Sequence, residues 1–239
     1  AGALVLQHAE AIFGITLTQI VRPGVPVMYG GFTSNVDMKT GAPAFGTPEY
    51  VKAAQASGQL ARRIGVPFRS SNVTAANAVD AQAAYESQMS LWGCLMGGAH
   101  LVIHSAGWMH GGLTASYEKL ILDAEMLGMM QAYFTPIPVT DEALSLDAIA
   151  EAGVGGHFFG TAQTMAQYET AFHAPMLSNW DNHPNWLQKG SIDARTRANT
   201  VWKDLLADAE DPPLDPAVDE ALCAFVARRK AEGGVKTDF

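Results

Sequence analysis

Short apolar runs alternate with longer amphipathic stretches over the first 133 residues. Three runs, at 25–29, 66–70 and 100–105, have the length and residue types of buried parallel strands. Stretches at 3–21, 48–64, 80–96 and 116–133 have the apolar spacing of helices. Each strand thus precedes a polar loop and a helix, and the strands begin about 35–40 residues apart, which is the spacing of parallel βα units.

The first of these units, residues 25–49, organises the chain. Gly30 and Gly31 end its apolar run and open a polar loop. Thr47, Pro48 and Glu49 then supply a hydroxyl N-cap, a proline at the first helical position and an acid in the first turn. In α/β folds such loops, at the carboxyl ends of the strands, carry the ligand site.

After residue 136 the pattern becomes helical. Pieces that begin near residues 140, 145, 161 and 181, and stretches at 191–208 and 217–230, read as helices, and a glycine-rich break lies at 153–160. Three strands cannot close a sheet, and a (β/α)8 TIM barrel needs about 250 residues. The pattern therefore predicts an α/β fold that is the C-terminal part of a larger barrel, with residues 1–209 in the barrel domain and 210–239 as a linker, helix and tail.

Composition narrows the classes of function. The 239 residues are 48% hydrophobic and 16% charged, with a net charge of −9, which argues against non-specific nucleic-acid binding and a polybasic membrane anchor. Cys94 and Cys223 are in no ligand spacing and read as reduced thiols of a cytoplasmic protein. We expect no membrane span and no signal peptide, and the absence of an initial methionine suggests a processed or excised piece.

Polar and aromatic residues gather at the predicted strand ends, where a barrel would bring them to one mouth. We expect the candidate site to include Tyr29, Phe32, Asn35, Arg69, Asn72, His104, Trp108 and His110, with His157 joining from the glycine-rich break. Tyr29, Phe32 and Trp108 fit either an aromatic cage for an ammonium ion or packing that plugs the barrel top. His100, His104 and His110 lack a Cys or carboxylate partner at ligand spacing, so we predict no metal site.

Other motifs give weaker signals. Glu118, Asp123 and Glu125 share one predicted helix and read as solvated acids, or as acids that favour the helix N-terminus. The glycine-rich break is not followed by Gly-Lys-Ser/Thr, so it is no phosphate-binding P-loop, and no clear strand precedes it as a dinucleotide fingerprint requires. The chain also lacks the Gly-x-Ser-x-Gly elbow of serine hydrolases.

Several of these segments together resemble a known family. VPVMYGGFTSNVDMKTGAPAFGTPE, GVPFRSSNVTAANAVDAQAAYE, YEKLILDAE and GVGGHFFGTAQTM, in this order, are similar to the C-terminal half of the trimethylamine–corrinoid methyltransferases, up to about residue 168. The resemblance implies a TIM barrel about twice this length. It also implies transfer of a methyl group from a methylated amine to the cobalt of a separate corrinoid protein, with no cofactor bound in this chain.

One departure from the family bears on the substrate. The archaeal trimethylamine enzymes carry pyrrolysine in the loop that matches residues 71–77, where this chain has an ordinary residue near Thr74. Relatives without pyrrolysine include glycine betaine methyltransferases, so the resemblance implies a quaternary, betaine-like amine. Tyr29, Phe32 and Trp108 then become expected cage residues, and Arg69 or a histidine the partner of the betaine carboxylate.

Other interpretations remain open at this stage. The chain could be an inactive fragment or an interaction module of such a barrel, or another TIM-barrel enzyme that acts on a small carboxylate metabolite. A homo-oligomer is also compatible with the sequence.

Overall fold

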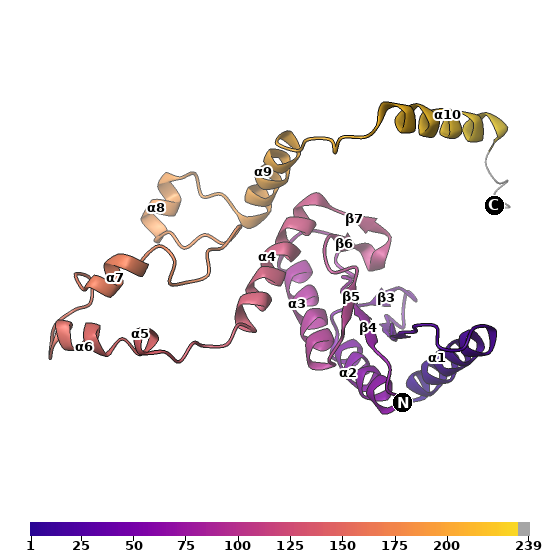
Figure 1. Cartoon of the computed structure of the whole chain (residues 1–239), viewed down its shortest axis with the longest axis horizontal. Helices are drawn as coiled ribbons and strands as arrows, with labels where there is room; N and C mark the ends of the chain where they lie inside the picture. Colours follow the sequence, from indigo (N-terminus) through magenta and orange to yellow (C-terminus); the bar gives the residue numbers. More distant parts are fainter. Residues whose placement is uncertain (234–239) are drawn as a thin grey trace. The chain divides into compact units, whose positions relative to one another are not determined.

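Three parallel strands and the helices between them form the first part of the computed structural model, which describes residues 1–233 (Figure 1). The chain divides into two units, Ala1–Trp202 and Lys203–Phe239. Residues 234–239 of the predicted tail lie outside the described residues. The helices of the first part are α1 (Gly2–Val21), α2 (Pro48–Arg63), α3 (Ala81–Met96) and α4 (Tyr117–Tyr133), and its central strands are β1 (Tyr29–Gly30), β4 (Phe68–Ser71) and β5 (Leu101–Ile103).

The central sheet has the order β1-β4-β5, and both pairs are parallel. Tyr29 lies opposite Phe68, and Ser71 lies opposite Ile103. The three predicted strands and their order are confirmed, but β1 begins at Tyr29 rather than at residue 25. Pro26 has no backbone N–H to donate to a ladder, and the first ladder donor is the Tyr29 amide, 2.8 Å from the Pro67 carbonyl.

Helices cover one face of this sheet. Tyr29, Ala61 and Phe68 form a buried cluster against which Ala11 and Ile15 of α1 pack. Helices α2 and α3 approach closely, since a Cβ at Gly58 would stand 1.9 Å from the carbonyl oxygen of Gly97. Alternate residues of β4 point to the opposite face. There Leu101 of β5 remains 45% exposed. A parallel sheet is ordinarily covered on both faces, so this one-sided α/β arrangement is consistent with part of a barrel.

The predicted helix starts at α2 and α3 are confirmed. The Thr47 hydroxyl accepts a hydrogen bond from the Tyr50 amide, and Pro48 opens α2. The Asp80 carboxylate accepts from the amides of Gln82 and Ala83 at the start of α3. These caps satisfy amides that have no partner within the helix.

Two short hairpins follow the strand ends, where the sequence predicted loops. Strand β2 (Asn35–Val36) pairs with β3 (Pro43–Ala44), and β6 (Trp108–Met109) pairs with β7 (Thr114–Ala115), both antiparallel. A 3₁₀ turn, η1 (His110–Gly112), closes the second hairpin. Two-residue ladders are too short to show the alternation of polar and apolar residues that marks a strand in a sequence.

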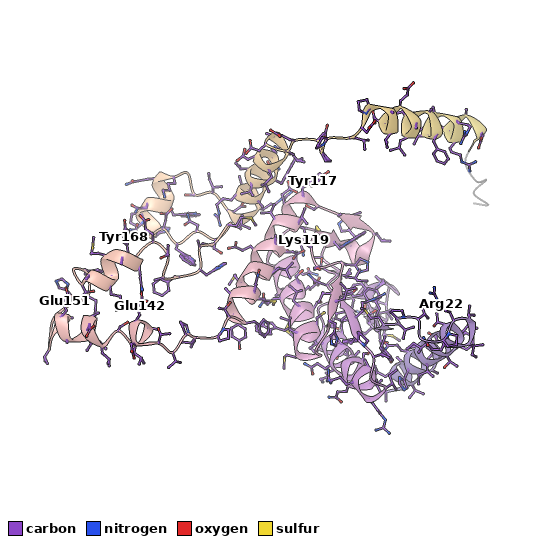
Figure 2. All side chains as sticks on the ribbon, viewed as in Figure 1. Arg22, Tyr117, Lys119, Glu142, Glu151 and Tyr168 are labelled. Atoms are coloured by element: carbon purple, nitrogen blue, oxygen red, sulfur yellow. The ribbon has the colours of Figure 1, made fainter. Side chains whose placement is uncertain are left out.

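The chain after residue 136 is helical, as predicted, over the residues described. Its helices are α5 (Asp141–Leu144), α6 (Leu146–Ala152), α7 (Ala162–Gln167), α8 (His183–Gln188), α9 (Ala194–Ala207) and, in the second unit, α10 (Pro216–Glu232). Figure 2 marks Glu142 on α5, Glu151 on α6 and Tyr168 directly after α7. Helix α10 exposes an apolar row of Val218, Leu222, Phe225 and Val226.

Glu118 and Glu125 of α4 hold later segments in place, and Asp123 and Glu125 are buried, so the interpretation of these two as solvated was wrong. Glu118 lies in the first turn of α4, as the alternative interpretation expected. Glu125 accepts hydrogen bonds from the amides of Met176, Leu177 and Ser178 at 2.8, 3.1 and 3.0 Å. Glu118 accepts from the side chains of Asn199 and Trp202 in α9. Asp123 is 1% exposed and lies beside the buried Lys119. A helix pattern shows which acids share a face but not which distant amides reach them.

Helix α1 corrects the expectation that no apolar run could span a bilayer. Its 20 residues have a mean hydropathy of 1.3 over an 18-residue window, which by length and composition alone suffices to cross a membrane. Its polar residues nevertheless contact the sheet unit: Gln7 donates to the Ser57 hydroxyl at 2.8 Å, and His8 Nδ1 lies 3.2 Å from the Tyr29 hydroxyl.

Candidate active site

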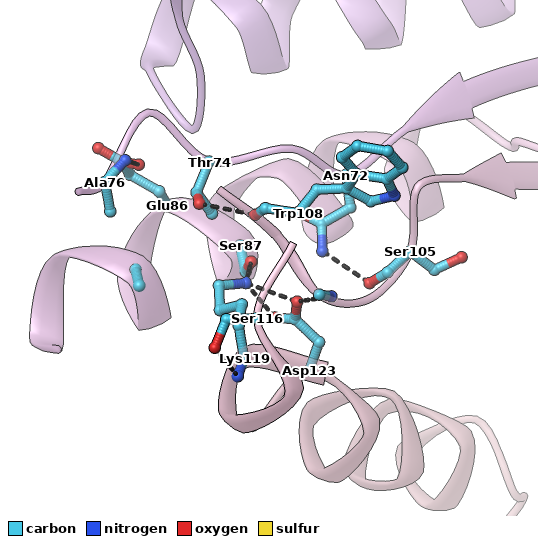
Figure 3. A network of polar contacts seen from close by, with 12 residues as sticks. Asn72, Thr74, Ala76, Glu86, Ser87, Ser105, Trp108, Ser116, Lys119 and Asp123 are labelled. Atoms are coloured by element: carbon cyan, nitrogen blue, oxygen red, sulfur yellow. Dashed lines mark hydrogen bonds and ion pairs between the residues drawn. The ribbon is translucent and has the colours of Figure 1, made fainter. Parts of the chain in front are cut away.

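The loops after β4 and β5 are joined to each other at the carboxyl end of the sheet (Figure 3). The side-chain amide of Asn72 donates to the Ser105 carbonyl at 2.9 Å, and the Thr74 hydroxyl donates to the Trp108 carbonyl at 3.0 Å. Thr74 is fully buried, and its hydroxyl supports the loop that presents Trp108.

An aromatic cluster forms above this junction. The His104 ring meets the Trp108 ring edge-on at 5.4 Å, and the Phe32 ring lies 6.2 Å from that of His104. Phe45 and Tyr50 pack behind Phe32, at 5.3 and 6.3 Å between ring centroids. The structure therefore brings Phe32, His104 and Trp108 together, as predicted.

Phe45 and Tyr50 were missed by the sequence analysis. Both are nearly fully buried, and burial raises the pKa of the Tyr50 hydroxyl, which donates to the Ser71 carbonyl at 2.6 Å. The available signal was an isolated phenylalanine in an otherwise polar loop and an aromatic residue in the first turn of α2.

His104 has an unusual backbone conformation. Its φ of 57° lies in the left-handed region that side chains other than glycine rarely adopt. Its Nδ1 stands 2.9 Å from the Ser71 hydroxyl. Burial, followed by the positive charge of Arg69, lowers the pKa of His104, so the imidazole is neutral near pH 7.

Arg69 extends from β4 across Gly30, where a Cβ would stand 3.7 Å from the guanidinium carbon. Within residues 1–233, no carboxylate lies at ion-pair distance from it, and the Arg69 guanidinium makes no hydrogen bond there. The site thus combines aromatic surface, a neutral imidazole and an uncompensated cation. Such an arrangement suits an anion beside an apolar or cationic group.

Asn72 adds a buried polar group to the site. The residue is 1% exposed, and its side-chain oxygen has no hydrogen-bond partner among the described residues.

Tyr29 and Asn35 lie outside this cluster. The Tyr29 side chain is fully buried on the helix-covered face, where its hydroxyl contacts Gln7 and His8 of α1. Alternation along β1 decides this, because a residue one position away would point to the other face. Asn35 accepts a 2.6 Å hydrogen bond from the Thr47 hydroxyl, at the start of α2.

The two remaining predicted histidines lie outside the aromatic cluster. His110 is exposed, with a φ of 54°; it contacts the Thr114 hydroxyl at 2.8 Å within its own hairpin, and its Nε2 lies 3.3 Å from the Asn77 carbonyl in the loop after β4. His157 is exposed in the break at 153–160, and its ring lies beside that of Phe159, at 5.7 Å. The structure therefore does not bring His157 to the strand ends.

Metal-ligating side chains do not cluster in the part of the chain that the structure describes, where no group of three or more His, Cys, Asp or Glu residues could hold an ion. His100 instead accepts a hydrogen bond from the Phe68 amide at 3.1 Å. A cavity of about 460 Å³ lies among α5, α6 and α7, lined by residues between 141 and 167, none of them in the strand-end loops.

The sequence of this chain belongs to a defined family. The family model described as trimethylamine methyltransferase (MTTB) matches residues 1–234, and the chain is a member of that family.

Individual relatives show how similar this chain is to other methyltransferases. The chain is 38% identical to a glycine betaine methyltransferase of Desulfitobacterium hafniense strain Y51, over 98% of this chain and 49% of that protein. It is 32% identical to trimethylamine methyltransferase MttB2 of Methanosarcina mazei, over 95% of this chain and 46% of that protein. The trimethylamine methyltransferase MttB of Methanosarcina barkeri is 31% identical over the same shares. The chain spans about half the length of the curated relatives it matches.

Proposed function

We propose that residues 1–209 form the C-terminal part of a (β/α)8-barrel methyltransferase. Three parallel strands in chain order, with helices on one face, support this architecture. The face that carries Arg69 and Leu101 would then line the barrel interior, and the missing strands would pair with the free edges of β1 and β5. A cytoplasmic location belongs to the same proposal.

We further propose that the substrate is a quaternary amine with a carboxylate, of the glycine betaine type. The observation that carries this is the uncompensated Arg69 beside the aromatic cluster of Phe32, His104 and Trp108. Aromatic faces attract an ammonium ion, and a neutral imidazole does not repel it. The guanidinium supplies a partner for the carboxylate.

The chemistry needs little from the protein beyond placement. The bond between the nitrogen and one methyl carbon breaks, its electron pair stays on nitrogen, and a neutral tertiary amine leaves. The acceptor of the methyl group is the reduced cobalt of a separate corrinoid protein. No proton has to be supplied to the leaving amine, so this chain's residues orient the cation and exclude water.

Ligand binding in a protein with a complete barrel tests this function. Glycine betaine and tetramethylammonium should both raise the melting temperature, because a ligand stabilises the folded state that binds it. Trp108→Ala should weaken both ligands by up to roughly thirtyfold, the equivalent of about 2 kcal/mol for a desolvated cation–π contact, and Trp108→Phe by less. Tyr29→Phe is the matched control, since Tyr29 faces α1.

A substitution at Arg69 tests recognition of the ligand's carboxylate separately from recognition of its ammonium group. Arg69→Ala should weaken glycine betaine and leave tetramethylammonium nearly unchanged. Methylation of cob(I)alamin, followed spectroscopically, should show the same order of effects. Binding of small carboxylates alone, with no response to either ammonium compound, would instead indicate a different barrel enzyme. Response to none of them would indicate a non-catalytic module.

A further inference from the structure

Three charged side chains are buried behind the candidate site. Lys119 is fully buried, Asp123 is 1% exposed and Glu86 is 7% exposed. The Lys119 ammonium lies 2.5 Å from both carboxylate oxygens of Asp123 and 2.6 Å from the Ser87 hydroxyl. Figure 2 marks Lys119 in the first turn of α4. Burying such charges is costly, and apolar residues of equal volume are often no less stable. Stability alone therefore does not account for them.

Both carboxylates bind backbone amides of the strand-end loops (Figure 3). Asp123 accepts from the Gly107 amide at 2.9 Å. Glu86 accepts from the amides of Ala75 and Ala76 at 2.8 and 3.0 Å. The loop after β5 is thus fixed to α4, and the loop after β4 is fixed to α3.

Trp108 lies between these two attachment points. Gly107, which Asp123 holds, directly precedes it. The Trp108 carbonyl accepts a hydrogen bond from the Thr74 hydroxyl. Thr74 directly precedes Ala75 and Ala76, whose amides donate to Glu86. A shift of either attachment would therefore move the indole relative to His104.

We propose that Asp123 and Glu86 are positioning residues that set the place of Trp108, and that Lys119 keeps Asp123 available as an acceptor. The proposal rests on the proposed function only where it concerns binding of the ammonium ion. Burial lowers the pKa of Lys119, and the neighbouring charge and hydrogen bond of Asp123 oppose that shift.

Two double variants separate the effect of the Lys119 and Asp123 charges from the effect of the hydrogen bond between Asp123 and the Gly107 amide. Lys119→Met with Asp123→Asn removes both charges and keeps an oxygen that can accept from Gly107. Lys119→Met with Asp123→Ala removes that oxygen as well. Ser87→Ala is the matched control, because it takes one hydrogen bond from Lys119 without touching either loop.

The readout is the fluorine resonance of Trp108 in protein labelled with 5-fluorotryptophan, assigned with Trp108→Phe. We expect the resonance to shift or broaden in the alanine double variant and to stay in place in the asparagine double variant and in Ser87→Ala, whatever their melting temperatures. An unchanged resonance in the alanine double variant would overturn the proposal. So would equal shifts in all three variants, since they would reflect a general loss of packing.

A measurement on the unmutated protein tests the hydrogen bond on which the proposal depends, even if the double variants do not fold. The Gly107 amide should exchange with solvent far more slowly than an unbonded loop amide, and exchange at the unbonded rate would overturn the proposal.

Titration of the complete barrel with tetramethylammonium measures how the variants change ligand affinity. We expect about tenfold weaker binding in the alanine double variant, part of the cation–π contribution, and near-normal binding in the asparagine variant. Normal affinity in the alanine variant would overturn the positioning role. If the unmutated protein binds no quaternary amine, the proposed function fails, while the fluorine and exchange data still decide whether Asp123 positions Trp108.

Discussion

Replacing Glu125 by glutamine should release the segment that follows residue 175 from α4. The Glu125 carboxylate, 7% exposed, accepts from three consecutive amides, those of Met176, Leu177 and Ser178, and from the Ser178 hydroxyl at 2.7 Å. Glutamine has a similar shape, but it removes the charge and turns an –NH₂ group toward amides that also donate.

The expected magnitude follows from these contacts. A hydrogen bond to a charged group contributes about 1.5–3 kcal/mol, and a buried amide left without a partner costs about 1–3 kcal/mol. Because glutamine keeps one acceptor oxygen, we expect a net loss of about 2–3 kcal/mol in the free energy of local opening. Where reclosing is faster than chemical exchange, that corresponds to roughly 30- to 150-fold faster exchange of the three amides.

Amide hydrogen exchange with residue resolution measures this directly. Glu142→Gln, which alters an exposed acid of α5, is the matched control. Burial raises the pKa of Glu125, but the hydrogen bonds from Ser178, Leu177 and Met176 outweigh it and hold that pKa below its usual value. The stabilisation is therefore present above the unfolded pKa of about 4.3 and is lost as pH falls through the folded value. Equal exchange in Glu125→Gln and Glu142→Gln would refute this reasoning.

Three further predictions concern other residues. Hydrogen bonds from Asn199 and Trp202 lower the pKa of Glu118 to about 2. The contribution of Glu118 to stability should therefore persist well below pH 4 and disappear as pH falls toward about 2. Trp202 fluorescence should follow this acid transition, and the transition should be lost in Glu118→Gln. Protonated His104 would repel an ammonium ion, so binding of tetramethylammonium should weaken as pH falls through the lowered pKa of His104, and His104→Asn should abolish this dependence in a calorimetric titration. Gly46→Ala should destabilise the fold by about 1–3 kcal/mol in urea unfolding, because its Cβ would stand 2.4 Å from the Glu86 Cα. Gly41→Ala is the control for backbone strain, since Gly41 has a similar positive φ but open surroundings.

Local signals in the sequence were enough to place the βα units. The apolar runs, the glycines that end them and the caps Thr47 and Asp80 each act over a few residues, so they could be interpreted without the fold. The same signals placed Phe32, His104 and Trp108 at strand ends, and the parallel order of the strands brought these three together. The family resemblance, which the family match confirms, rested on the same segments.

Contacts between distant residues were decided by the tertiary structure alone. Tyr29 faces α1 because the first ladder contact of β1 falls on that residue, and a strand reverses its face with each position. Phe45 and Tyr50 join Phe32 and His104 only once the chain has folded back through a hairpin and a helix. The partners of Glu118 and Glu125 lie more than fifty residues away along the chain. Helical spacing fixed the shared face of these acids, but only packing determined which amides and side chains would meet it.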